Sequence, residues 1–243
     1  MRLVSAIPFP VLSDPMVKRT AEYVLPGTLA ERGRVWLDEV RGAVAPRPHL
    51  VLDPPRCALL VIDMLRYFAD PSGRCYLPAT AATAPQIAAL VDAWRRQQGM
   101  VVFTRHCHQG EHDLGMLGRF FSDYIHAGEA EAEIIDLLAP RPGEDVIPKT
   151  TYDAFIGTAL GSRLEARGVT QVLVTGVLTH MCCETTARSA FCRGYEVYVA
   201  ADACAANNEA RHIGSLLSMA ESVAIVMSTH EVLARCRIAR ESS

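Results

Sequence analysis

Short apolar segments alternate with helical patterns along most of this chain, and this alternation is the feature that most restricts its fold. The apolar runs lie at residues 57–62, 100–104, 145–147, 171–177, 196–200 and 223–227, each short enough for a strand buried on both faces. Helical patterns occur at residues 85–98, 131–138, 157–167, 181–193 and 208–221, and from Thr229 onward. Such alternation forms βαβ crossovers. We therefore predict an α/β fold: a three-layer, doubly wound, mainly parallel β-sheet with helices on both faces.

The first 55 residues follow a different pattern. Prolines punctuate this segment, and only residues 28–40 can form a helix, because proline resists regular structure. We therefore expect a Pro-rich N-terminal arm over residues 1–55, laid over the domain or over a neighbouring subunit. Residues 56–243 then form one domain, and a chain of 243 residues buries enough surface to fold without a disulfide or metal.

Composition excludes several classes of protein. Lys and Arg number 24 and Asp and Glu number 27, so the formal net charge is −3 and no basic face for nucleic acid is expected. No apolar stretch approaches the ~20 residues that cross a bilayer, and the N-terminus lacks the pattern of a secretion signal. The eight cysteines include no C-x-x-C pair, which indicates reduced thiols. We expect a soluble, cytoplasmic protein without nucleic-acid or membrane partners.

Three polar positions follow predicted strands, at the edge where parallel sheets bind their ligands. Asp63 follows the first strand, Lys149 follows the third, and Cys182 and Cys183 lie at the start of the helix after the fourth. A helix N-terminus lowers a thiol pKa, favours the thiolate and can bind an oxyanion. Position alone leaves both cysteines open as the nucleophile. Asp63 can equally be a turn carboxylate, and Lys149 a surface group.

These residues, in this order, resemble the isochorismatase-like hydrolase superfamily. Its cysteine branch includes nicotinamidases, N-carbamoylsarcosine amidohydrolases and streptothricin hydrolases. The G-V-x-T-x-x-C-x-x-x-T pattern of the family maps onto Gly176, Val177, Thr179, Cys182 and Thr186 without a gap. The resemblance covers about residues 55–235 and selects Cys182, not Cys183, as the nucleophile.

The resemblance implies a catalytic triad in which Cys182 is the nucleophile, Asp63 is the base and later the acid, and Lys149 is the cation that tunes both. A carboxylate near the thiol can accept its proton and return it to a leaving amine. A nearby ammonium favours the thiolate and lowers the carboxyl pKa. The resemblance also implies an oxyanion hole of the backbone N–H groups of Leu178 and Cys182, reached through a cis peptide bond between Val177 and Leu178. No cofactor is expected.

Two residues depart from the cysteine branch. Leu65 stands where relatives commonly carry Gln, so a polar contact is lost. His180, in Gly-Val-x-x-His, resembles the true isochorismatases, which lack the cysteine and hydrolyse a vinyl ether by acid catalysis from the Asp. We predict a cysteine hydrolase that cleaves an amide, lactam or ureido C–N bond of a small molecule through a Cys182 thioester. The alternatives are acid catalysis by Asp63 on an enol ether, without a covalent intermediate, and a non-catalytic binding protein on the same scaffold.

Substrate-binding residues are expected in the segments that follow the strands. The candidates are Phe68, His106, His108, Tyr152, Phe155 and His180, with core packing as the alternative for the aromatic residues. His106 and His108 also align with a metal-binding D-x-H segment of nicotinamidases. His106 replaces the Asp of that segment and no third ligand is evident, so no metal is expected. Apolar helix faces in the last third of the chain, and the resemblance, predict a homodimer or homotetramer.

Overall fold

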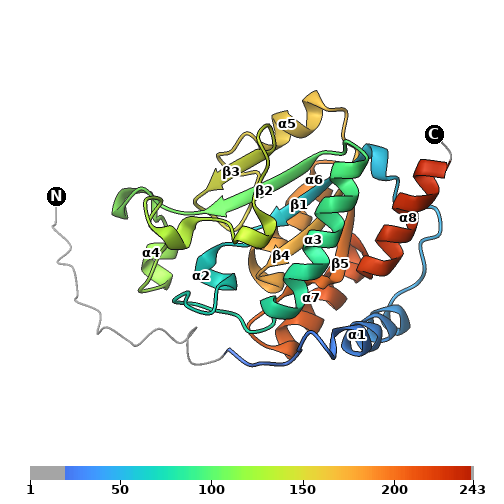
Figure 1. Cartoon of the computed structure of the whole chain (residues 1–243), viewed down its shortest axis with the longest axis horizontal. Coiled ribbons are helices and arrows are strands. Elements are labelled where there is room, and N and C mark those ends of the chain that lie inside the picture. Colours follow the sequence, from blue (N-terminus) through green and yellow to red (C-terminus); the bar gives the residue numbers. More distant parts are fainter. Residues whose placement is uncertain (1–19, 242–243) are drawn as a thin grey trace, which may run out of the picture.

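The computed structural model describes residues 20–241, and a parallel sheet lies at the centre of this part of the chain (Figure 1). Its six strands are β1 (Cys57–Ile62), β2 (Val101–His106), β3 (Asp145–Lys149), β4 (Gln171–Val177), β5 (Glu196–Ala205) and β6 (Ala224–Met227). They lie in the order β3-β2-β1-β4-β5-β6, and every neighbouring pair is parallel. Strand order reverses between β1 and β4, so a crevice opens at the carboxyl ends of these two strands.

Helices cover both faces of the sheet, which confirms the predicted three-layer α/β fold. They are α1 (Leu29–Ala43), α2 (Arg66–Ala69), α3 (Thr80–Arg96), α4 (Leu117–Phe120), α5 (Leu160–Ala166), α6 (Glu184–Cys192), α7 (Glu209–Ser222) and α8 (Thr229–Glu241). Right-handed crossovers place α3 on one face and α5, α6 and α7 on the other, and Figure 1 shows α3 in front of the strands and α6 behind them. Between residues 20 and 241 there is no helix long and apolar enough to cross a membrane.

The helix α3 shows how the sequence pattern produces this packing. Ile87, Leu90, Val91 and Trp94 recur at the spacing of one helical face, and all four are buried. Trp94 also donates its indole N–H to the Cys57 carbonyl oxygen at 2.9 Å, which ties α3 to the start of β1. The helix begins five residues before the predicted start.

Residues 131–138 do not form the predicted helix. Two 3₁₀ turns, Ala130–Ala132 and Asp136–Leu138, flank an extended stretch instead. In this stretch the Glu133 carbonyl accepts the Arg66 N–H at 2.8 Å, and Ile134 forms an antiparallel bridge with Leu65. The backbone groups that a helix would satisfy internally are therefore bonded to the loop after β1.

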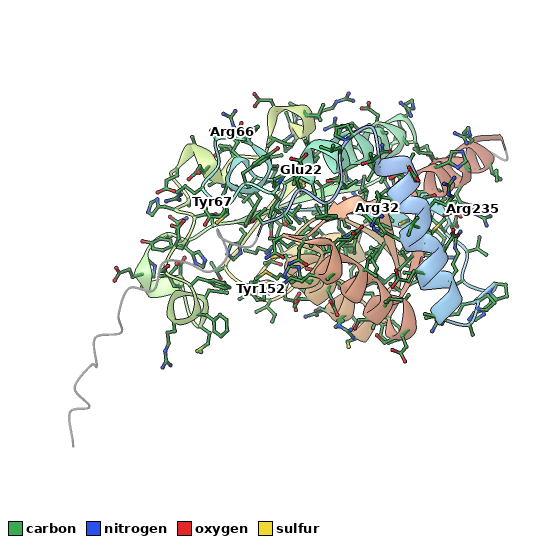
Figure 2. The ribbon with its side chains drawn as sticks, turned by 90° about the horizontal axis from the view of Figure 1, so that it is seen from below. Glu22, Arg32, Arg66, Tyr67, Tyr152 and Arg235 are labelled. Carbon is green, nitrogen blue, oxygen red and sulfur yellow. The ribbon has the colours of Figure 1, made fainter. Side chains whose placement is uncertain are left out.

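The N-terminal segment that the structure describes lies on its own chain. α1 packs against α7 and β5, and the Ala21 N–H donates to the Asn207 carbonyl oxygen at 2.8 Å (Figures 1 and 2). α1 matches the helix expected at residues 28–40 and buries Trp36 completely. The first 19 residues of the predicted arm lie outside the described residues.

Gly176, near the end of β4, occupies a position that other residues tolerate poorly. Its φ is 105°, and a Cβ atom there would lie 2.1 Å from the Ile62 carbonyl oxygen on β1. Gly176 and Ile62 are register partners, so the glycine lets the two strands meet closely just before the crevice.

Replacing Gly176 with alanine is expected to destabilise the protein by about 3 kcal/mol or more, because a backbone clash adds to an unfavourable φ. Gly214→Ala is the matched control: Gly214 lies in α7, and an added Cβ there has no neighbour within 4 Å. That change should be neutral or stabilising by up to about 1 kcal/mol. Denaturant unfolding measures both variants, and equal stability would contradict this role for Gly176.

Candidate active site

Three titratable side chains meet at the carboxyl edge of the sheet. Asp63 follows β1, Lys149 ends β3, and Cys182 lies between β4 and α6 in a π-helical turn, Thr179–Cys183, here called the nucleophile turn. Lys149 Nζ lies 2.7 Å from Asp63 Oδ2 and 3.3 Å from Cys182 Sγ. The fold therefore assembles the three residues that the sequence predicted as a triad.

Asp63 is completely buried and held in one orientation. Its φ of 48° lies in the left-handed region, which non-glycine residues seldom adopt. Thr104 Oγ1 donates to Asp63 Oδ1 at 2.6 Å and accepts the Asp63 backbone N–H at 3.0 Å. Burial acts to raise the Asp63 pKa, but the Lys149 ammonium and these hydrogen bonds bring it below its ordinary value. Asp63 is thus a carboxylate at neutral pH.

Lys149 is the charge that keeps this carboxylate ionised. Its ammonium also donates to the Thr151 carbonyl oxygen at 2.8 Å. Burial acts to lower the Lys149 pKa, but Asp63 and Cys182 together raise it above its ordinary value. The two buried charges therefore form an ion pair within a site closed to solvent.

Cys182 differs from its prediction in one respect: its surroundings favour the neutral thiol over the thiolate. Burial raises its pKa to about 12, and the effect of Lys149 in the opposite direction is smaller. The physical reason is that Asp63 already neutralises the Lys149 ammonium, so little positive potential remains for sulfur. The Asp63 carboxylate shares the Lys149 ammonium with the thiol and is near enough to raise the thiol pKa as well. Asp63 is therefore placed to remove the thiol proton during attack.

The backbone before Cys182 contains one feature that the resemblance implied. The peptide bond between Val177 and Leu178 is cis, which confirms that expectation. The Leu178 carbonyl oxygen accepts the N–H groups of Met181 at 3.0 Å and Cys183 at 3.3 Å, which folds the turn around Cys182. Leu178 and Cys182 both line the cavity described next.

A small cavity of about 70 Å³ opens beside Cys182, and it is here called the substrate cavity after the residues predicted to line it. Aromatic and apolar side chains form most of its wall. The lining residues are Tyr67, Phe68, His106, His108, Leu117, Phe121, Asp123, Tyr124, Ile125, Tyr152, Leu178, Met181 and Cys182, with Tyr67 and Tyr152 labelled in Figure 2. Four of the predicted substrate-binding residues, Phe68, His106, His108 and Tyr152, are among them.

Phe155 and His180, also predicted to bind substrate, do not line the substrate cavity. The Phe155 ring stacks on Tyr195 with centroids 6.1 Å apart, and the Arg193 guanidinium lies over it at 4.9 Å. His180 Nε2 lies 3.4 Å from an Arg211 Nη1 atom on α7. In this tight turn, side chains of successive residues point in different directions, so His180 meets α7 whereas Met181 and Cys182 face the cavity.

One wall of the substrate cavity was not predicted from the sequence. Phe121, Asp123 and Tyr124 lie just after α4 in the long connection between β2 and β3, where the sequence predicted no strand or helix. Tyr67 donates its hydroxyl to Asp123 Oδ2 at 2.9 Å, and an Arg74 Nη1 atom lies 3.3 Å from Asp123 Oδ1. These contacts hold the wall against the segment that follows β1.

The histidine pair beside the substrate cavity does not fit a metal ion. The rings of His106 and His108 meet edge to face with centroids 5.0 Å apart, and His108 Nδ1 lies 3.2 Å from Asp113 Oδ1. His106 Nδ1, however, lies 3.4 Å from the Lys149 ammonium, which would repel a cation. In the part of the chain that the structure describes, no three metal-ligating side chains cluster.

Comparisons with known proteins agree with this architecture. The family described as Isochorismatase domain matches residues 57–231. The chain is 39% identical to Nicotinamidase 3 of Arabidopsis thaliana over 166 residues, which are 67% of this chain and 80% of that protein. It is 32% identical to phenazine biosynthesis protein PhzD of Pseudomonas fluorescens over 187 residues, 75% of this chain and 87% of that protein.

Solved structures give the same result. A cysteine hydrolase from Pseudomonas syringae pv. phaseolicola 1448A superposes with a TM-score of 0.77 at 31% identity, covering 80% of this chain and 99% of that one. The matched region includes Asp63, Lys149 and Cys182. The chain therefore belongs to the isochorismatase family and is a hydrolase of the isochorismatase-like cysteine hydrolase superfamily.

Proposed function

We propose that this protein hydrolyses the C–N bond of a small amide, lactam or ureido compound through a thioester on Cys182. The observation that carries this proposal is the contact of Cys182 with Lys149, whose ammonium pairs with Asp63, at the wall of the substrate cavity. A nucleophile, a base and a compensating charge are the groups that acyl transfer to sulfur requires.

Acylation begins when Cys182 Sγ attacks the carbonyl carbon of the substrate. Asp63 accepts the thiol proton, so no free thiolate is needed in the resting enzyme. The carbonyl oxygen becomes an oxyanion and accepts hydrogen bonds from the backbone N–H groups of Leu178 and Cys182. Asp63 then gives the proton to the leaving nitrogen, the C–N bond breaks, and an amine or ammonia departs from the thioester.

Deacylation repeats these steps with water as the nucleophile. Asp63 accepts a proton from water as its oxygen attacks the thioester carbonyl carbon. The C–S bond then breaks, and Asp63 returns the proton to Cys182 Sγ, which restores the neutral thiol. Lys149 stays charged throughout and stabilises negative charge as it moves between the Asp63 carboxylate and sulfur.

The substrate cavity favours a small, flat substrate. Aromatic rings from Tyr67, Phe68, Phe121, Tyr124 and Tyr152 form much of its lining, and rings stack well on planar groups. One relative is named a nicotinamidase, and an aromatic carboxamide of that kind suits this lining. We therefore place small aromatic carboxamides first among the substrates to test.

The second candidate function is hydrolysis of an enol ether by acid catalysis from Asp63. It is supported by the Isochorismatase domain match and by the departure at His180. It requires a protonated Asp63, whereas the Lys149 ammonium at 2.7 Å favours the carboxylate. C–N bond hydrolysis is therefore the better-supported function.

A substrate panel tests the proposal. Purified protein is incubated with aromatic carboxamides, lactams and ureido compounds, with isochorismate as the enol ether, and product formation is followed by mass spectrometry. We expect ammonia or amine release together with a transient acyl adduct on the Cys182 peptide after acid quench. Turnover of isochorismate alone, without an adduct, would assign the protein to the second candidate function.

The hydroxyl of Thr104 should matter for catalysis, because it donates to Asp63 Oδ1 at 2.6 Å. Thr104→Val removes this donor, so the Asp63 pKa should rise and kcat should fall about tenfold, the effect of one charge-assisted hydrogen bond. The acidic limb of the kcat profile should move to higher pH. Thr104→Ser keeps the hydroxyl and is the control, and coincident acidic limbs for valine and wild type would contradict the assignment.

A further inference from the structure

Helix α1 lies outside the matched family region, yet it contacts the helix that supports the nucleophile turn. α1 packs against α7, and α7 packs against the nucleophile turn. Trp36 on α1 is fully buried and donates its indole N–H to Glu209 Oε1 at 2.8 Å. Arg32 Nε donates to the same oxygen at 3.0 Å. Two side chains of α1 thus hold Glu209, the first residue of α7.

His212 lies one turn further along α7 and connects α1 to the nucleophile turn. It is completely buried, and its ring meets Trp36 edge to face with centroids 4.5 Å apart. On its other side, His212 Nδ1 lies 2.9 Å from Thr179 Oγ1. Burial lowers the His212 pKa to about 3, which favours the neutral ring. Its Nδ1 can then accept a hydrogen bond from the Thr179 hydroxyl.

Ser215, the next residue on this face of α7, holds the main chain of the same threonine. Its Oγ lies 3.1 Å from the Thr179 carbonyl oxygen and 2.6 Å from Glu184 Oε2. The side chain of Thr179 is therefore bonded to α7, and its carbonyl oxygen shares the one Ser215 hydroxyl proton with Glu184. Thr179 directly follows Leu178 and precedes Cys182 by three residues, so its placement sets the placement of both.

We propose that Trp36, His212 and Thr179 form a positioning relay through which the N-terminal helix orients the nucleophile turn. None of the three lines the substrate cavity, so they are positioning residues and not catalytic residues. Acyl transfer requires sulfur and the oxyanion donors to be held within about 0.5 Å of the productive geometry. The catalytic purpose of the relay rests on the function proposed above, whereas its effect on the turn does not.

Hydrogen exchange tests the relay without a substrate. Thr179→Val removes the hydroxyl at nearly constant shape, and Trp36→Phe removes the indole N–H. Each variant is expected to speed amide hydrogen exchange at Met181 and Cys183 about tenfold. This is the effect expected when one buried hydrogen bond that restrains local opening is lost. Peptides covering residues 176–186 report this exchange by mass spectrometry. In an active preparation, kcat should fall in both variants while KM stays close to wild type.

Two matched variants distinguish the relay from general destabilisation. Thr179→Ser retains the hydroxyl and should exchange at the wild-type rate. Trp94→Phe removes the other buried indole donor, which bonds to Cys57 at the opposite end of the sheet, and should leave residues 176–186 unaffected. Unchanged exchange in Thr179→Val, or an equal increase in Trp36→Phe and Trp94→Phe, would overturn the relay. Faster exchange confined to Thr179→Val and Trp36→Phe would support the relay even if the protein hydrolyses no C–N bond. The absence of C–N hydrolysis would then count against the proposed function and not against the relay.

Discussion

Cys182→Ala is expected to lower kcat/KM for C–N hydrolysis by about 10⁴-fold or more, the loss typical of removing a covalent nucleophile. Cys182→Ser should be nearly as inactive. A serine hydroxyl holds its proton far more tightly than a thiol, and Asp63, whose pKa is held below its ordinary value, is too weak a base to remove it. Steady-state kinetics of amine release on the best panel substrate measures both losses.

Cys183→Ala is the matched control for this prediction. Cys183 is adjacent, also buried and also a free thiol, but its Sγ faces the Thr175 carbonyl oxygen at 3.8 Å and it does not line the substrate cavity. Its variant should keep most activity and lose only modest stability. Full turnover by Cys182→Ala, or equal losses in the two alanine variants, would rule out the thioester mechanism. Retained isochorismate hydrolysis in Cys182→Ala would identify Asp63 acid catalysis as the reaction.

The fold could be predicted where local pattern and tertiary environment agree. β1 and β4 match their predicted bounds because strands buried on both faces are apolar throughout. Residues 131–138 were wrongly predicted as a helix because their backbone hydrogen-bonds to Arg66 and Met64, contacts that no local pattern encodes. β5 also runs five residues beyond its predicted end, to Ala205, because a register shift lets it pair with Gly176.

The candidate site could be predicted only in its residue types and positions. Asp63, Lys149 and Cys182 follow strands whose carboxyl ends share one edge, so the topology alone brings them near each other. The pKa of the Cys182 thiol depends on its burial and on the 2.7 Å contact between Lys149 and Asp63, neither of which the sequence shows. Phe121 and Asp123 were missed for a different reason: they belong to an irregular connection whose path is fixed by distant partners.

Lys149→Met is expected to reduce both activity and stability, because it leaves Asp63 as a buried, unpaired carboxylate. Removing one partner of a buried ion pair lowers the free energy of unfolding by about 3 to 5 kcal/mol. The Asp63 pKa should rise above its ordinary value, since burial then acts without the ammonium. The variant should therefore lose activity about 10³-fold at neutral pH. The reason is that Asp63, the base, is misplaced or protonated and that no cation remains beside the Cys182 sulfur.

The pH dependence of the free energy of unfolding distinguishes loss of this ion pair from a simple packing defect. In the wild type the folded-state pKa of Asp63 is depressed, so its contribution to stability is present above the unfolded value of about 3.9 and is lost as pH falls below it. In Lys149→Met the folded-state pKa is raised. In this variant the contribution of Asp63 to stability is greatest below about pH 3.9 and is lost as the pH rises through the folded-state pKa of Asp63. The stability difference between the two proteins should thus narrow on acidification.

The double variant Asp63→Asn/Lys149→Met completes the test. With both charges removed, no unpaired ion remains in the buried site, so this protein should be more stable at neutral pH than Lys149→Met, although inactive. Denaturant unfolding of the wild type, Asp63→Asn, Lys149→Met and the double variant, at neutral pH and near pH 4, gives the coupling between the two side chains. Additive losses, or a Lys149→Met deficit that does not change with pH, would mean that the ion pair does not govern the ionisation of Asp63, and the assignment of Asp63 as the base would fail with it.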